Sequence, residues 1–333
     1  MQAILSTRER RSWAFVVAYL GLLLLYSLLD FGLQTSIVTG FSGVLQGMLI
    51  FMVAAGFSII FGLLDVLNFA QGGFFMLGAY VGLTVYISLP ASIPGDLAFL
   101  LGIVAAIIAG IILGAVTEVF LIRPLYQRPV FTLLLTFGLS AVIREVVILI
   151  PFWGPAAKPP APPPPLLSGQ FTLVGQSFAT YRLFIIGMGI VMMVGVLLLL
   201  RFTRIGIIIR AGLEDSEMVQ ALGINVRRVF TLVFIVGTVV ATLGGIVVTP
   251  FRGAFIDMGD EFLLAAIIVV IIGGLGSYEG TAIASIIVGI TRAMAERISL
   301  EYFGAPVLAE LSILAVMVIV LFIQPSGLFG REE

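Results

Sequence analysis

The chain has 333 residues, of which 60% are hydrophobic and 11% charged, with a mean hydropathy of +1.22 and a formal net charge of −1. A soluble globular protein carries about 25% charged residues. This chain has too little polar surface to cover a water-soluble particle of its size, so its solvent is largely lipid. The balanced charge provides no bulk attraction to nucleic acid, which we exclude as a partner.

Cysteine and histidine are absent, and lysine occurs once, at Lys158. Their absence excludes thiol nucleophiles, imidazole bases and zinc sites of the usual ligand types. A P-loop needs Gly-Lys-Ser/Thr to hold phosphates, and this chain has no such motif around its single lysine. We therefore expect a chain that is not an enzyme, with no catalytic residue, no metal and no cofactor of its own.

Long apolar stretches predict an all-α polytopic membrane protein with about 8–10 transmembrane helices, forming a single transmembrane domain over 1–333. Each is long enough to cross a hydrocarbon core about 30 Å thick. The stretches lie near 13–29, 41–64, 70–89, 97–122, 131–151, 183–201, 229–249, 281–298 and 307–323. A further run at 262–273 is shorter, and we favour a crossing segment over a half-helix that turns back.

Arginine placement orients the predicted spans. With ten crossings, eleven arginines fall in the loops of one side, whereas the loops of the other side carry only Lys158, Arg182 and Arg252. The positive-inside rule then places the N- and C-termini in the cytoplasm. The extracytoplasmic loop at 152–182 contains a proline-rich run. We expect stiff polyproline II there, either as a linker between two halves of the bundle or as a docking surface.

Two interruptions of the apolar pattern, at 65–73 and 273–280, are candidates for function. Irregular backbone at membrane depth survives only inside protein or beside a water-filled cavity, and transporters place solute sites and moving joints at such breaks. Plain cytoplasmic turns are the alternative, and the amides at the first break could equally satisfy the interrupted backbone. The candidate substrate-path residues at these breaks are Asn68, Gln71, Gly72, Gly273, Gly274 and Gly276.

Four ionisable residues fall within predicted spans: Glu118, Arg144, Glu145 and Arg292. Such groups are expensive in lipid, so we expect them to face protein or water. Arg144 and Glu145 are consecutive and point about 100° apart on a helix, so we expect no pair between them. Three Gly-x-x-x-Gly pairs, beginning at 43, 78 and 110, are expected to pack helices within the chain.

The cytoplasmic loop at 202–228 contains a predicted short amphipathic helix. Its first turn carries Glu214, Asp215 and Glu217, which suit the positive end of a helix dipole. The apolar stripe consists of Met218, Ala221 and Leu222, and Gly223 occupies the position where helices end. Interfacial helices usually carry basic residues toward lipid. The acidic charge therefore favours a protein partner for this stripe.

Four blocks resemble the permease subunits of branched-chain amino-acid ABC importers. They match in order and spacing along about 41–323, although the family often has histidine where this chain has Gln71. The blocks are Asn68-Phe69-Ala70-Gln71-Gly72 with Met76-Leu77-Gly78-Ala79-Tyr80, Thr136-Phe137-Gly138-Leu139-Ser140, Ala211-Gly212-Leu213-Glu214-Asp215 with Ala221-Leu222-Gly223-Ile224-Asn225, and Gly273-Gly274-Leu275-Gly276-Ser277.

The resemblance implies an importer subunit in a prokaryotic plasma (inner) membrane. It would pair with a second, homologous or identical, permease and with two cytoplasmic ATPase subunits that bind ATP and Mg²⁺ and grip 214–223. A solute-binding protein would deliver the solute outside. The solute would be a branched-chain amino acid or a relative such as urea, a short amide or an aromatic acid. Thr136 and Gly138 join the candidate substrate path. The rivals are an ATP-independent channel or secondary transporter and a membrane-embedded enzyme.

Overall fold

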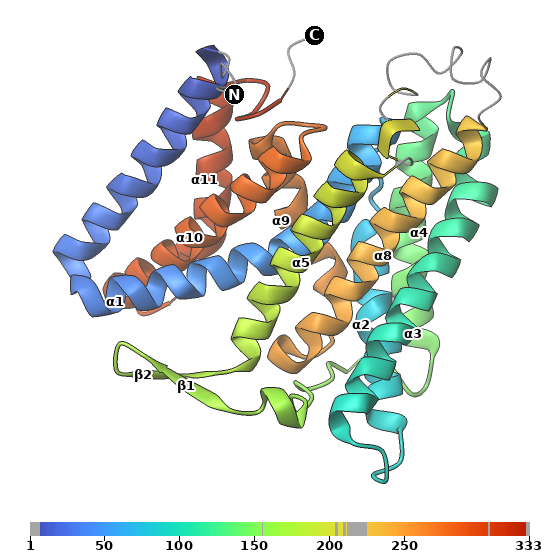
Figure 1. The fold of residues 1–333 in the computed structure, drawn as a ribbon, viewed down its shortest axis with the longest axis horizontal. Helices are drawn as coiled ribbons and strands as arrows, with labels where there is room; N and C mark the ends of the chain where they lie inside the picture. Colours follow the sequence, from blue (N-terminus) through green and yellow to red (C-terminus); the bar gives the residue numbers. More distant parts are fainter. Residues whose placement is uncertain are drawn as a thin grey trace.

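The computed structural model describes residues 7–154, 156–203, 206–208, 211, 225–305 and 307–330. Within this part of the chain the fold is a helical bundle with one small β-hairpin (Figure 1). The helices are α1 (Thr7–Leu64), α2 (Gln71–Ser88), α3 (Gly95–Val116), α4 (Pro129–Leu149), α5 (Tyr181–Phe202), α8 (Val226–Arg252), α9 (Met258–Gly273), α10 (Tyr278–Phe303) and α11 (Val307–Ile323), with short turns η1 (Thr117–Ile122), η2 (Arg123–Leu125) and η3 (Pro165–Leu167). The hairpin pairs β1 (Gln170–Leu173) with β2 (Gln176–Ala179) in antiparallel register.

The bundle is an all-α polytopic membrane architecture. Five of the described helices are long and apolar enough to cross a membrane, and the pair α9 and α10, bent by 117°, makes a sixth span if counted as one. Helix α1 is counted once, although its 58 residues would extend about 87 Å if straight. A kink at Gly32, with φ 78° and ψ 170°, divides it. The bent helix α1 therefore contains both of the first two apolar stretches of the sequence, 13–29 and 41–64.

The helix directions define two ends of the bundle. Helix α5 ends at Phe202 and α8 begins at Val226, so the segment between them lies at one end, here called the loop end. The beginning of α1 and the end of α11 lie at the same end (Figure 1). There, the Ser12 hydroxyl donates to Gln324 Oε1 at 3.1 Å and to the Leu328 carbonyl. Both described ends of the chain therefore meet at the loop end.

Close backbone contacts hold the bundle together. A Cβ at Gly78 would clash with the backbone of Thr242 in α8, and one at Gly47 would clash with the backbone of Ser285 in α10. The partners of Gly43, Gly82, Gly110 and Gly114 likewise lie on neighbouring helices of this chain. This confirms that the three Gly-x-x-x-Gly pairs pack helices internally. No hydrophobic effect drives helices together in lipid, so small residues that permit close approach take over that role.

The proline-rich loop lies across the opposite end of the bundle. Lys158 and Ala254 exchange two backbone hydrogen bonds of 2.7 and 3.1 Å, and the Tyr86 hydroxyl donates to the Pro162 carbonyl at 2.8 Å. Pro164 has φ −53° and ψ 145°, as expected for polyproline II. Pro164 thus has the polyproline II geometry that the sequence predicts, and the loop is hydrogen-bonded to α2 and to the residues that follow α8.

Candidate functional site

The first break separates α1 from α2 inside the bundle. Residues 65–68 are non-helical, and Asp65 has a positive φ of 51°. The Gln71 amide donates to the Gly237 carbonyl at 2.8 Å. Gly237 lies near the middle of the 27-residue helix α8. The first break therefore runs within protein from the end of α1 to the middle of α8, the setting in which irregular backbone is tolerated in a membrane.

Polar side chains at the first break bond to one another and to backbone. Asn68 and Gln71 are fully buried, and Asn68 Nδ2 donates to Gln71 Oε1 at 3.2 Å. Asn68 Oδ1 accepts from the Ala70 N–H at 3.2 Å. The fully buried Thr136 accepts from the Phe69 N–H at 3.2 Å. In this conformation these side chains satisfy the interrupted backbone, which was one of the two roles left open by the sequence.

Gly72 brings the first break against α9. A Cβ at Gly72 would clash with the Gly259 carbonyl and lie 2.9 Å from Cβ of Leu263. Gly138, in contrast, has no atom of another element within 4 Å of where its Cβ would lie. The structure thus groups Asn68, Gln71, Gly72 and Thr136 at one break and leaves Gly138 apart on α4.

The second break lies at the loop end. Helix α9 stops at Gly273, and Gly274 (φ 101°) and Gly276 (φ 80°) adopt backbone angles that L-residues rarely tolerate. The Ser277 side chain caps α10 by accepting from the Gly280 N–H at 3.1 Å. A Cβ at Gly62 would lie 3.0 Å from Cα of Gly276. The second break therefore packs against the last turn of α1, directly before the first break.

The segment that follows α11 caps the end of α9. The Leu328 N–H donates to the Ile272 carbonyl at 2.8 Å, and the Phe329 N–H donates to the Gly273 carbonyl at 2.9 Å. The last carbonyls of a helix have no partner within it, so this segment supplies their missing donors. The Phe329 ring also makes an edge contact with Trp13 of α1.

The predicted coupling residues Glu214, Asp215, Glu217, Met218, Ala221, Leu222 and Gly223 lie outside the described residues. What is described is the frame around them, namely the last turn of α5 and the first turn of α8. At this frame Arg201 of α5 forms an ion pair with Glu279 of α10. Asn225 caps α8 by accepting from the Arg228 N–H at 3.2 Å.

Glu118 is the centre of a buried polar cluster close to the start of α8. Its side chain is fully buried within η1, a π-helical turn, and faces protein as expected. Arg123 donates to both carboxylate oxygens, at 2.9 and 3.2 Å, and the Tyr126 hydroxyl donates at 2.8 Å. Arg123 also donates to the Thr231 hydroxyl of α8 at 2.7 Å. We call these four residues the Glu118 clamp, because they join the turn after α3 to α8.

The expectation that Arg144 and Glu145 do not pair was wrong. Arg144 Nη1 lies 3.2 Å from Glu145 Oε1, and its Nη2 lies 3.1 Å from Asp257 Oδ1. The 100° between neighbouring Cβ directions separates short side chains, but both of these are long and substantially exposed, so their ends meet around the helix. Arg144 thus connects α4 to the turn before α9.

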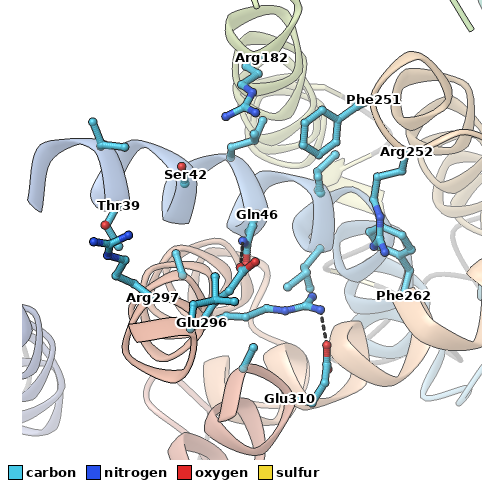
Figure 2. A pocket seen from close by; sticks show the side chains of 18 residues that line it. Thr39, Ser42, Gln46, Arg182, Phe251, Arg252, Phe262, Glu296, Arg297 and Glu310 are labelled. Carbon is cyan, nitrogen blue, oxygen red and sulfur yellow. Dashed lines mark hydrogen bonds and ion pairs between the residues drawn. The ribbon is translucent and has the colours of Figure 1, made fainter. Parts of the chain in front are cut away.

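A cavity of about 760 Å³ opens between α1, α5, α8, α9, α10 and α11. It lies at the end of the bundle opposite the loop end, because α5 and α11 begin there and α8 and α10 finish there. In Figure 2, Gln46 points from α1 toward Glu296 of α10, and Arg182 and Arg252 come from α5 and α8. Leu45, Leu49 and Ile50 add an apolar wall.

Most charges in the cavity have partners in the chain. Arg292 pairs with Glu310, Arg252 with Glu261 at 2.7 Å, and Arg297 with Glu301 at 3.2 Å. Arg182 stacks on Phe178 and Phe251, with its guanidinium 5.1 and 5.6 Å from the ring centres.

Two groups in the cavity lack a counter-charge. Among the described residues, no carboxylate lies within ion-pair distance of Arg182, and no arginine within that distance of Glu296. Glu296 accepts only from the Gln46 amide, at 3.0 Å, and the buried Gln46 Oε1 has no donor in this part of the chain. The cavity therefore holds one free cation, one free carboxylate and one orphaned amide oxygen.

The sequence does not predict the cavity, although it places Arg292 within a span and Arg182 and Arg252 in outer loops. One signal was available, because Gln46 and Glu296 are polar residues inside or at the edge of apolar stretches. Such residues usually face a protein interior or a cavity. The cavity is formed by six helices, and α1 and α5 are far from the others in sequence, so no local pattern reveals the whole of it.

A family model described as a branched-chain amino acid transport system permease component matches residues 39–321. The chain belongs to this family. The LivH high-affinity branched-chain amino acid permease protein of Escherichia coli K12 is 28% identical over 306 residues, covering 88% of this chain and 95% of the relative. BraD of Pseudomonas aeruginosa is 26% identical over 302 residues with the same coverage. A probable LivH of Methanocaldococcus jannaschii is 26% identical over 307 residues, covering 87% and 92%.

The permease family assignment settles the class of the protein. It is a multi-pass membrane permease component of the branched-chain amino acid transport type, and such components are transport subunits and not enzymes. The solved structure of PsaBC from Streptococcus pneumoniae in complex with Fab overlaps with a TM-score of 0.43 at 14% identity, over 91% of this chain and 96% of that chain.

Proposed function

We propose that this permease imports small amino-acid-like solutes by alternating access, driven by two ATPase subunits that bind the cytoplasmic loop at 202–228. A second permease subunit completes the membrane portion, and a solute-binding protein delivers solute from outside. ATP and Mg²⁺ bind to the ATPase subunits. Both termini and the loop end face the cytoplasm of a prokaryotic cell.

The observation that carries this proposal is the placement of the two candidate regions at opposite ends of the bundle. The frame of the 202–228 loop lies at one end, and the 760 Å³ cavity opens at the other. Helices α5 and α8 run between them, since each has one end beside the loop and the other beside the cavity. Movement of the loop would therefore be carried along both helices to the cavity.

The two breaks fit moving joints within this scheme. The first break runs from the end of α1 to Gly237 of α8, and the second lies beside the last turn of α1. Helices move as stiff bodies, whereas positions with unusual backbone angles absorb the change in direction. Asn68, Gln71, Gly72, Thr136, Gly138, Gly273, Gly274 and Gly276 are proposed to line or hinge the path.

Disrupting the segment 214–223, which the sequence predicts to be an acidic amphipathic helix, tests the coupling step. The paired change Met218→Asp and Leu222→Asp places charges on the proposed contact stripe, and Gly223→Pro alters its end. Both should abolish ATP-driven uptake and co-purification of the ATPase subunits while the permease remains inserted. Lys158→Gln, at the opposite end of the bundle, is the matched control. Undiminished co-purification of the ATPase subunits with the paired variant would contradict the proposal.

A further inference from the structure

Exposed charges gather where the last turns of α4 approach the start of α9. The Glu145 and Asp257 side chains are 63% and 74% exposed, and Asp260 is exposed on the first turn of α9. A Cβ at Gly72 would clash with the Gly259 carbonyl. The first turn of α9 is therefore level with the first turn of α2, which contacts the middle of α8. Charged groups at membrane depth face protein or water, so this face does not lie against lipid.

One ion pair joins the two helices at this face. Arg144 of α4 donates through Nε and Nη2 to Asp257 Oδ1, at 3.3 and 3.1 Å, and Asp257 lies in the turn before α9. Among the described residues, no other hydrogen bond or ion pair joins α4 to the segment 253–273. Helix α4 otherwise packs mainly on α2. The pair is therefore the polar contact that holds the last turns of α4 beside α9.

The ion pair lies about two turns of α4 from the first break. Thr136, eight residues before Arg144, accepts from the Phe69 N–H and donates to the Leu67 carbonyl, both at 3.2 Å. Eight helical residues span about 12 Å, and α4 runs away from the loop end. The pair is thus located between the candidate path residues at the first break and the end of the bundle opposite the loop end.

The surroundings of the pair suit a contact that opens and closes. An ion pair between exposed side chains gains little net free energy, because water competes for both charges. Arg144 also has a partner on its own helix, since its Nη1 lies 3.2 Å from Glu145 Oε1. If α4 moved away from α9, Arg144 would keep this partner, and the exposed Asp257 carboxylate would be hydrated. Opening therefore leaves no buried charge without a partner.

We propose that the Arg144–Asp257 pair is a latch that closes the end of the solute path opposite the loop end. When the pair is formed, α4 is held beside α9 over the first break. When it separates, α4 swings away and the first break becomes accessible from that end. This inference rests on the proposed import function and adds the point at which the path opens.

Cysteine labelling measures the latch without transport. The chain has no cysteine, so Ser140→Cys places one thiol at a buried position of α4 between Thr136 and Arg144. In the assembled importer, a membrane-impermeant maleimide added from outside should label this thiol about two- to fivefold faster when Asp257→Asn is added, the change that one exposed ion pair makes in a two-state equilibrium. The exchange of Arg144→Asp with Asp257→Arg should restore slow labelling. Asp260→Asn is the matched control, because Asp260 is exposed on the same face and has no ion pair in the described chain.

A reversible cross-link tests whether the latch must open during transport. With Arg144→Cys and Asp257→Cys in one chain, a short bifunctional methanethiosulfonate should lower ATP-driven uptake of leucine about tenfold in proteoliposomes that contain the complete importer. Dithiothreitol should restore the uptake. The matched control joins Val142→Cys to Val146→Cys, both exposed and one turn apart on α4. The reagent should leave uptake by this control unchanged, because it connects α4 to no second helix.

Three results would refute the latch. They are full uptake by the cross-linked variant with Arg144→Cys and Asp257→Cys, labelling of Ser140→Cys that does not change with Asp257→Asn, and equal acceleration of that labelling by Asp260→Asn. A failure of the import function itself would appear differently. Wild-type proteoliposomes would then take up no leucine with ATP, whereas the labelling differences would remain.

Discussion

The Glu118 clamp predicts a graded loss of stability when its members are replaced one at a time. Glu118 is fully buried and accepts three hydrogen bonds, two of them from Arg123. Glu118→Gln keeps the shape of the side chain but removes the charge. Breaking a fully buried ion pair costs about 3–5 kcal/mol. Here Arg123 is 31% exposed and can be hydrated once the carboxylate is gone. We therefore expect Glu118→Gln to lower the free energy of unfolding by about 1.5–3 kcal/mol, the range typical of a hydrogen bond to a charged group.

The other members of the clamp should cost less. Tyr126→Phe removes one donor from Glu118, and Thr231→Val removes one acceptor from Arg123. Thr231→Val also deletes the bond that Thr231 donates to the Arg227 carbonyl at 2.9 Å. In each variant Glu118 and Arg123 keep each other as partners, so we expect the free energy of unfolding to fall by about 1.5 kcal/mol, the lower end for a hydrogen bond to a charged group. Arg128→Gln, directly before α4, is the control, because the exposed Arg128 side chain lies over the Phe131 ring at 5.9 Å and forms no ion pair with a described residue.

Thermal unfolding of the detergent-solubilised permease measures this order. The expected ranking of midpoints is wild type and Arg128→Gln highest, Tyr126→Phe and Thr231→Val intermediate, and Glu118→Gln lowest. Because Thr231 lies in the second turn of α8, beyond the 202–228 loop, the ratio of solute imported to ATP hydrolysed should fall in the same order. A Glu118→Gln protein as stable as wild type, or an Arg128→Gln protein equally destabilised, would refute the assignment of the clamp.

Two further predictions concern backbone contacts. Gly245→Ala would press a methyl group against the Phe75 carbonyl of α2, so we expect overpacking to lower the free energy of unfolding by about 1–3 kcal/mol, visible as a lower unfolding midpoint. Gly138→Ala, at an open position, should leave the midpoint unchanged. Equal midpoints for the two variants would contradict the close α2–α8 packing. Phe329→Pro removes the N–H that caps the Gly273 carbonyl, so it should lower the free energy of unfolding of the permease by about 1–3 kcal/mol. Phe329→Leu keeps that N–H and should retain most of the stability, and a proline variant no worse than the leucine variant would show that the cap is unimportant.

Sequence patterns predicted the breaks and the burial of Glu118 because both arise from local constraints. An Asp, an Asn and paired glycines interrupt an apolar run wherever they occur, and a carboxylate inside a span must find protein or water. The pattern could not say which partners Glu118 finds. Thr231 is more than one hundred residues away and reaches Arg123 only because α3 and α8 pack together.

The β-hairpin within the proline-rich loop has a partial signal in the sequence. Gln170-Phe171-Thr172-Leu173 alternates polar and apolar residues, and Val174-Gly175 follows as a two-residue turn with both φ values positive. The alternation is typical of a strand, but a β-branched residue such as Val174 rarely adopts a positive φ, so the turn has none of the usual hairpin residues except Gly175. The cavity has a weaker signal, the polar residues Gln46 and Glu296 at apolar stretches. Its unpaired charges become recognisable only after the other arginines have been assigned to their partners.

The central claim is that solute movement through this permease requires ATP hydrolysed by separate subunits. The most direct measurement is the initial rate of leucine uptake into proteoliposomes that contain the permease pair and the binding protein, with and without the ATPase subunits and ATP. We expect leucine to accumulate against its gradient only when the ATPase subunits and ATP are both present. Uptake at the same rate without ATP or without the ATPase subunits would contradict it and favour a channel or secondary transporter.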